Sequence, residues 1–192
     1  MTNNQEIVSV GLAETPQMEQ LIIPDTVKAI RDNAHSDKKG LYHVDLGRSV
    51  TRVGAHAFYW CVNLSQVDFS PSLRSIGYGA FSNTAIESMT LPSKLWHIEG
   101  SAFQMIRCLR SVITGSELRT VGDGAFFEDE NLEEFTFTSA KIRSIHRNAF
   151  DGCVNLKRVI VPESLVSLYL EKLPRRARQL LVARQDSMLV GG

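Results

Sequence analysis

The sequence predicts an α/β repeat solenoid, which is a stack of similar coils rather than one globular core. Two observations lead to this prediction: a recurring Ala-Phe pair, and a set of apolar columns with the same period. The pair occurs five times with gaps of 23, 22, 23 and 24 residues, at Ala57-Phe58, Ala80-Phe81, Ala102-Phe103, Ala125-Phe126 and Ala149-Phe150. A period of this size indicates one structural unit that is copied along the chain and stacked on its neighbours.

The apolar columns appear when each unit is numbered from its first apolar residue, which is Met18 in the first unit and Leu156 in the seventh. Positions one, four, six, ten and thirteen are then apolar in 34 of 35 places, with Thr114 as the exception. At 43% apolar content, random placement would fill about 15 of these places. The sequence therefore predicts about seven units over residues 18–168.

Each unit is expected to begin with a short strand. Positions four and six are apolar and alternate with outward residues, which is the pattern of a half-buried strand. Position seven holds turn residues such as Pro24, Gly47 and Pro92, so the strand ends there. Positions ten and thirteen bring the chain back past the core through a short helical or irregular segment, and the Ala-Phe pair closes the coil.

Both ends of such a stack need covering. Residues 1–17 are expected to cover the first unit, where Ala34-His35 replaces the Ala-Phe pair. At the other end, residues 163–192 are expected to form a cap. Leucine spacing over residues 163–173 predicts a helix that stops at Pro174, residues 178–183 could add a final strand, and the tail through Gly192 is expected to fray.

The bulk composition excludes several classes of function. Lys plus Arg equals Asp plus Glu at 21 each, so no global field favours nucleic acid or anionic lipid. The chain shows neither a signal peptide nor a run of 18 apolar residues. We therefore expect an intracellular protein, or a cell-surface or secreted one if a leader has been removed.

The three cysteines are expected to be free and mostly buried. Cys61 and Cys153 hold equivalent positions four units apart, which is about 19 Å at the spacing of neighbouring strands. A disulfide needs Cα atoms within about 7 Å. Cys108 lies two units from each, so the sequence predicts three thiols and a reducing compartment.

These motifs resemble the BspA-type, or Treponema pallidum-type, leucine-rich repeat. Leu91-Pro92-Ser93-Lys94-Leu95 matches one half of that repeat, and Ser75-Ile76-Gly77-Tyr78-Gly79-Ala80-Phe81 matches the other. The resemblance covers residues 18–173. It implies a right-handed curved solenoid with short parallel strands lining one face. It also implies a binding protein, since many bacterial members are surface adhesins.

The first candidate site is the outward face of the strands at positions three and five. Stacking places these side chains on one continuous surface, which solenoids commonly use for binding. Trp96 is expected to serve as an aromatic anchor. It stands among the basic residues of the second candidate site, where it could stack on a ring or an arginine. The predicted ligand-binding residues are His43, Asp45, Gln66, Asp68, Thr90, Glu134 and Trp96.

The second candidate site is a basic ladder at positions eleven and twelve, with one member in each of six consecutive units. Like charges on neighbouring strands repel, so the ladder needs either counter-charges or an anionic partner. Pairing with Glu87, Glu99 or Asp123 is the first explanation; an acidic protein or a sulfated glycan is the second. The ladder consists of Lys28, Arg52, Arg74, His97, Arg119 and Arg143.

No catalytic set emerges from the sequence. The five histidines fall in different units without metal-ligand spacing, and no cysteine has a local histidine partner. The acidic run Glu128-Asp129-Glu130, followed by Glu133-Glu134, is expected to be a solvated loop or a counter-patch for another copy's ladder. The prediction is a non-catalytic protein-interaction module without cofactor or metal. An anion-binding or adhesin-like protein and a structural subunit of a larger assembly remain alternatives.

Overall fold

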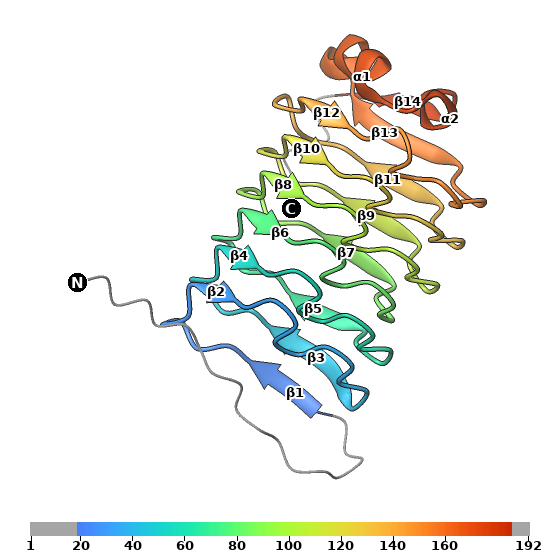
Figure 1. The fold of residues 1–192 in the computed structure, drawn as a ribbon. Helices are drawn as coiled ribbons and strands as arrows, with labels where there is room; N and C mark the ends of the chain where they lie inside the picture. The colour runs from blue at the N-terminus through green and yellow to red at the C-terminus, as the bar shows by residue number, and fades with distance from the viewer. Residues whose placement is uncertain (1–18, 186–192) are drawn as a thin grey trace.

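The computed structural model describes residues 19–185 as a stack of flattened coils (Figure 1). Each coil contributes one strand to a first face and a shorter strand to a second face. The first-face strands are β1 (Glu19–Ile22), β3 (Leu41–Asp45), β5 (Gln66–Asp68), β7 (Ser88–Thr90), β9 (Ser111–Ile113), β11 (Glu134–Thr136) and β13 (Arg158–Pro162). The second-face strands are β2 (Ala29–Ile30), β4 (Arg52–Val53), β6 (Ser75–Ile76), β8 (His97–Ile98), β10 (Thr120–Val121) and β12 (Ser144–Ile145).

All strand pairs are parallel and join equivalent positions of successive units. The second face is one six-stranded sheet from β2 to β12. The first face is a three-stranded sheet, β1-β3-β5, followed by a five-stranded sheet that runs from β7 to β14. The break between β5 and β7 coincides with the unit from Leu64 to Ala85, which is 22 residues long. The second sheet was not expected, because two-residue strands leave no alternating pattern in the sequence.

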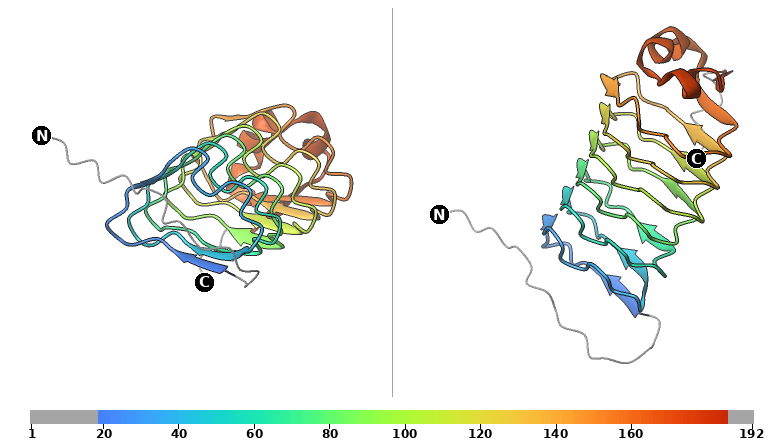
Figure 2. Two further views of the ribbon diagram at one scale, coloured as in Figure 1. Left: turned by 60° about the horizontal axis from the view of Figure 1, so that its bottom comes forward. Right: turned by 45° about the vertical axis from the view of Figure 1, so that its right-hand side comes forward.

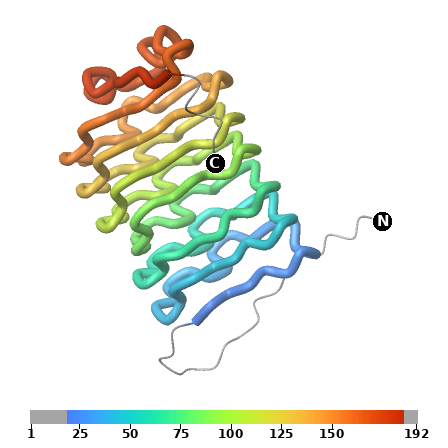
Figure 3. The backbone as a smooth tube through the Cα atoms, turned by 180° about the vertical axis from the view of Figure 1, so that it is seen from behind, coloured from blue at the N-terminus to red at the C-terminus, as the bar shows by residue number. Residues whose placement is uncertain are grey.

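The Ala-Phe pairs form a single file through the interior, as the repeat predicts. Phe58, Phe81, Phe103, Phe126 and Phe150 stack face to face with ring centroids 5.2, 5.6, 5.4 and 5.8 Å apart. Their interplanar angles lie between 7° and 12°. His35 extends the file at 5.4 Å from Phe58, in the place where the first unit lacks its phenylalanine. The coils therefore lie directly on top of each other, which the view from behind also shows (Figure 3).

Thr114, the polar exception in the apolar columns, is buried with both oxygen atoms in use. Its hydroxyl oxygen accepts a hydrogen bond from the backbone N–H of Thr138 at 3.2 Å. Its carbonyl oxygen accepts one from the Thr138 hydroxyl at 2.7 Å. These bonds join two successive units, so the hydroxyl is satisfied in the core.

Two turn positions in most units take left-handed backbone conformations. The earlier position holds Asn33, His56, Gly79, Ser101 and Gly124, with φ between 52° and 59°. The later position holds Asp37, Trp60, Asn83, Met105, Glu128 and Gly152, with φ between 56° and 80°. Most of these residues are not glycine, so the stacked neighbours hold the turn in a conformation that an isolated chain would rarely adopt.

The C-terminal end is covered by helices, as expected (Figure 2). A 3₁₀ turn, η1 (Glu163–Leu165), leads into α1 (Val166–Lys172), which ends before Pro174. A further short helix, α2 (Arg175–Arg178), precedes β14 (Leu181–Arg184). The buried Tyr169 of α1 donates a hydrogen bond to the Ser139 carbonyl at 2.8 Å and lies 4.9 Å from the Phe137 ring, fixing the helix to the last coils.

Three expectations about the ends and the core need correction or fall outside the described residues. Leu165 and Leu168 lie in η1 and α1, not in a seventh return strand, because the cap replaces the coil there. Cys108 is exposed because it stands two residues later in its unit than the buried Cys61 and Cys153. The predicted N-terminal cap of residues 1–17, Met18 and the frayed tail lie outside residues 19–185.

Candidate functional site

The first face carries two rows of outward residues held in register by the parallel strands. One row aligns position five across successive strands, as in Ile22–Asp45–Asp68 and Thr90–Ile113–Thr136. The other aligns position three across the same strands. The face thus brings together His43, Asp45, Gln66, Asp68, Thr90 and Glu134, six of the seven residues predicted for it.

At the N-terminal part of this face, His43 and Asp68 form a cross-strand pair. The His43 Nε2 and Asp68 Oδ2 atoms are 2.9 Å apart, and the Asp68 side chain is largely exposed. Asp45 also has a local structural role, because its Oδ1 accepts a hydrogen bond from the backbone N–H of Gly47 at 2.8 Å. That contact holds the turn after β3, where Gly47 has φ of +61°.

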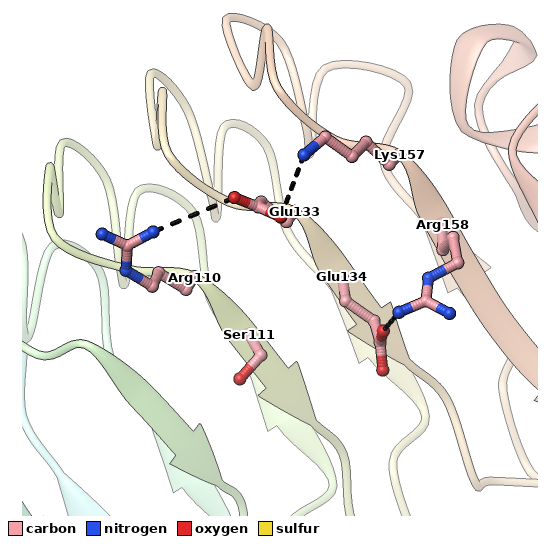
Figure 4. Close-up of a pocket in the computed structure, with 6 residues that line it drawn as sticks. All are labelled: Arg110, Ser111, Glu133, Glu134, Lys157 and Arg158. Carbon is pink, nitrogen blue, oxygen red and sulfur yellow. Dashed lines mark hydrogen bonds and ion pairs between the residues drawn. The ribbon is translucent and has the colours of Figure 1, made fainter.

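At the C-terminal part, five charged side chains beside Ser111 form two sets of ion pairs, which we call together the first-face network (Figure 4). Glu133 lies 3.0 Å from Lys157 and 3.9 Å from Arg110, while Glu134 pairs with Arg158. These residues line a shallow depression of about 400 Å³. The hydrogen bond from Lys157 and its positive charge lower the pKa of Glu133. The charges alternate in sign from strand to strand, so they satisfy one another.

Apolar residues on this face differ in exposure. Ile113 is 43% exposed near the centre, and Ile22 is 63% exposed on β1. Ile160 also stands in the position-five row, between Thr136 and Val182, but it is buried. The exposed centre of the face is therefore formed by Thr90 and Ile113, with the first-face network on one side and the His43–Asp68 pair on the other.

The basic ladder lies on the other side of the coil stack, beside the second-face strands. Lys28, Arg74, Arg119 and Arg143 stand just before their strands, while Arg52 and His97 are the first residues of β4 and β8. Successive backbone hydrogen bonds join Arg74 to Trp96 and Trp96 to Arg119 at 2.8 Å each. The structure thus divides the ladder into two adjacent rows rather than one.

Trp96 is sandwiched between two guanidinium groups of the ladder. The Cζ atoms of Arg74 and Arg119 each lie 4.6 Å from its ring centroid. Cation–π contacts hold both arginines on the ring. Trp96 therefore belongs to the ladder, and the structure does not bring it together with the other six residues predicted for the first face.

Carboxylates do not neutralise most of the ladder. Within residues 19–185, Lys28, Arg74, Arg119 and Arg143 form no salt bridge, and only Arg52 approaches an acidic group, Asp32, at 3.6 Å. Asp123, one of the three predicted counter-charges, lies 3.0 Å from His146 instead. His97 binds the Thr120 hydroxyl at 2.9 Å.

Comparison with family models identifies the repeat. The model described as "BspA type Leucine rich repeat region" matches in six copies, over residues 5–129 and 119–171. The chain belongs to this family. No curated protein matches the sequence significantly.

Several solved structures share the fold at low sequence identity. The pneumococcal vaccine antigen PcpA superposes with a TM-score of 0.75 and 17% identity, over 88% of this chain and 42% of that chain. A Eubacterium ventriosum leucine-rich-repeat protein gives 0.60 and 18%, over 73% and 48%. The T. pallidum protein TpLRR gives 0.53 and 19%, over 78% and 61%. The chain spans about half the length of these proteins.

The acidic run of this BspA-type chain is not the solvated loop that its composition predicts. Asp129 lies three residues after Phe126, in the interior slot that Cys153 fills after Phe150, and it is fully buried. Burial raises the pKa of its carboxyl well above the usual range, opposed by a hydrogen bond from the Ile106 N–H. Glu133 and Glu134 belong to the first-face network, so the run splits between the interior and the surface.

Sequence reasoning missed Arg110 and Lys157 on this face, and it did not include Arg158, at position three of its unit, among the predicted ligand-binding residues. The signal was present, because position two reads Arg110, Glu133 and Lys157 in three successive units.

Within residues 19–185 no cluster of His, Cys, Asp or Glu is arranged to hold a metal ion. In the same part of the chain, no helix has the length and apolar character needed to cross a membrane.

Proposed function

We propose that this BspA-type chain is a non-catalytic protein-interaction module that binds its partner on the first face. The in-register rows of outward side chains are the observation that supports this proposal. A partner with a flat surface could contact several units at once, with Thr90 and Ile113 at the centre and charges on both sides. Such an interface would combine an apolar centre with a polar rim.

The first face has an acidic part and a part in which the charges are paired with one another, and a partner would have to complement both. Asp45 and Asp68 are acidic, and His43 already contacts one of them. The network around Glu133 and Glu134 is internally paired, so it contributes hydrogen-bonding groups more than net charge. The proposed partner therefore presents basic groups toward β3 and β5 and polar groups toward β11 and β13.

A single bulky charge at the centre of the face tests this proposal. Thr90→Arg places a guanidinium beside Ile113, and Ser144→Arg is the matched control on the exposed part of β12. Proteins captured from a native lysate and identified by mass spectrometry should bind wild type and Ser144→Arg but not Thr90→Arg. A partner that binds Thr90→Arg as well as wild type would contradict the proposal.

The ladder supports a second candidate function, recognition of an anionic partner. Its specific support is the Arg74–Trp96–Arg119 sandwich, which holds two guanidiniums in place without a carboxylate. Arginine is suited to bidentate contact with carboxylate, sulfate or phosphate. An acidic protein or a sulfated glycan is favoured over nucleic acid, because the net charge of the chain is zero.

Salt dependence distinguishes the two candidates. Heparin, used as a sulfated probe, should bind wild type with an affinity that falls as salt rises. The triple variant Arg74→Ala, Arg119→Ala and Arg143→Ala should lose this binding, whereas Thr90→Arg should keep it. Equal binding by the triple variant would exclude the ladder.

The free cysteines support a reducing compartment for the protein. Cys61, Cys108 and Cys153 are unpaired, and Cys108 is exposed. An exposed thiol persists more readily where thiols are kept reduced. Recovery of Cys108 as a mixed disulfide from native material would instead favour a cell-surface or secreted location.

A further inference from the structure

Two adjoining depressions on the turn side of the coils form a groove that neither proposed function uses. They share Tyr78, Ser101 and Gln104 and measure about 370 and 290 Å³. We refer to them together as the turn-side groove. The lining residues come from loops of consecutive units, so the groove runs along the stack.

Exposed aromatic rings line one end of this groove. Tyr59 is 37% exposed, Trp60 44% and Tyr78 50%. His56 holds two of them in place, since its ring meets Tyr59 edge-on at 5.2 Å and Tyr78 at 5.4 Å. Most exposed side chains are polar, so a fixed cluster of open rings indicates a contact surface.

Two glycines leave room for rings of this cluster. A Cβ at Gly79, where φ is +59°, would lie 2.6 Å from the His56 ring. A Cβ at Gly100 would lie 3.3 Å from the Tyr78 ring. The His56 and Tyr78 rings therefore lie against glycine backbone of the next unit.

Amides and carboxylates line the rest of the groove. Among residues 19–185, the side chains of Gln104 and Asp151 have no hydrogen-bond partner. Asn83 donates to the Ser82 hydroxyl at 2.9 Å, and Asn148 donates to Asp123 at 3.1 Å. No lysine or arginine lines either depression.

We propose that the turn-side groove binds a neutral oligosaccharide. A sugar ring has an apolar face that can stack on Tyr78 or Trp60 and hydroxyl groups around its edge. Those hydroxyls can donate to the Asp151 carboxylate and can both donate to and accept from the Gln104 amide. The acidic groups Asp123 and Asp151 disfavour an anionic glycan here, so this site differs in ligand charge from the ladder.

A proline-rich peptide is another ligand that binds in aromatic grooves. Proline has no backbone N–H, so such a peptide has few donors for acceptor-only carboxylates. The unpartnered Asp151 would be left without a donor in that complex. The donor-rich saccharide fits the lining better.

The two tryptophans of the chain make this proposal measurable. Trp60 lies in the groove and Trp96 in the ladder, so Trp96→Phe leaves Trp60 as the only tryptophan. Titration of that variant with chitotriose, cellotriose, maltotriose and mannotriose should change the Trp60 emission saturably for at least one sugar. The same sugars should not change the Trp96 emission of Trp60→Phe.

Two further variants test whether the change in Trp60 emission comes from a sugar bound in the turn-side groove. In the Trp96→Phe background, Tyr78→Ala and Gln104→Ala should each weaken sugar binding at least about tenfold, while Thr90→Arg should leave it unchanged. Melting curves show whether each variant folds. If Tyr78→Ala does not fold, Gln104→Ala alone tests whether the sugar binds in the groove. The proposal fails if no sugar in this panel or on a neutral glycan array binds. It also fails if binding is insensitive to both variants, or if a proline-rich decapeptide binds in place of the sugars.

Discussion

The carboxylate of Asp129 accepts a hydrogen bond from the backbone N–H of Ile106 at 2.7 Å inside the coil stack. Its second oxygen, Oδ2, is buried and has no partner within residues 19–185. A buried, half-satisfied carboxylate destabilises a fold when it is charged.

Asp129→Asn should stabilise the protein at neutral pH by about 2 kcal/mol, because it removes the free-energy cost of holding an ionisable carboxyl group in a buried site while Oδ1 can still accept from Ile106. The folded pKa of Asp129 is raised, so its contribution to stability is complete below the usual pKa of an aspartate and is lost as pH rises toward the folded value. Chemical denaturation from pH 4 to pH 8 measures this. The difference between the two proteins should grow as pH rises, and a difference that shrinks would contradict the assignment.

Phe103→Ala should cost about 3–5 kcal/mol of unfolding free energy. The ring lies between Phe81 at 5.6 Å and Phe126 at 5.4 Å, so its removal opens a cavity in the middle of the file. Phe127→Ala is the control, because Phe127 is half-buried at the turn side and stands outside the file. Urea unfolding compares them, and a loss below about 1 kcal/mol for Phe103→Ala would not fit a close-packed column.

His35→Phe should raise the melting temperature, most clearly at acidic pH. His35 stacks on Phe58 at 5.4 Å, and its pKa is lowered by burial and, less strongly, by the charge of Lys38. A folded pKa below the usual value means that the wild type loses stability as pH falls below about 6.5. The variant should lack this loss. Melting curves between pH 5 and pH 8 that are parallel for the two proteins would count against the stacking role.

The three cysteines should differ sharply toward a thiol reagent. Only Cys108 should react quickly in the folded protein at pH 8, since it is exposed. Cys61 and Cys153 donate to the carbonyls of His35 and Phe126, and burial raises the pKa of Cys61 to about 11. Denaturant should release all three, and Cys108→Ser should abolish the fast phase. Fast labelling of Cys153 in the folded state would show that the last coil opens.

The sequence predicts the interior of this protein better than its surfaces. The Phe58-to-Phe150 file and the first-face strands follow from the repeat, because each residue's neighbour is the same position one unit away. The charge of Asp129 predicts a surface residue, whereas its position in the repeat predicts a buried one, and position decides. Its place three residues after Phe126 matches that of Cys153 after Phe150, which indicates the interior.

Surfaces were harder to predict because they depend on side-chain directions between units. The ladder's two positions and Trp96 among them could be listed from the sequence, yet the Arg74–Trp96–Arg119 sandwich depends on the side chains of two neighbouring units turning onto one ring. The turn-side groove depends on rings from one unit lying over glycines of the next, as Tyr78 does over Gly100. Contacts between equivalent positions of successive units can be predicted from the sequence. Contacts between different positions of neighbouring units cannot.

The phenylalanine file has a consequence for how such chains can change length. Within the file each ring stacks on the rings of the neighbouring units, so a duplicated 23-residue segment would bring its own phenylalanine and fit between two existing ones. Growth by duplication would lengthen all exposed surfaces together without redesigning the interior. A family built in this way can vary the length of the stack while the packing of its interior stays the same.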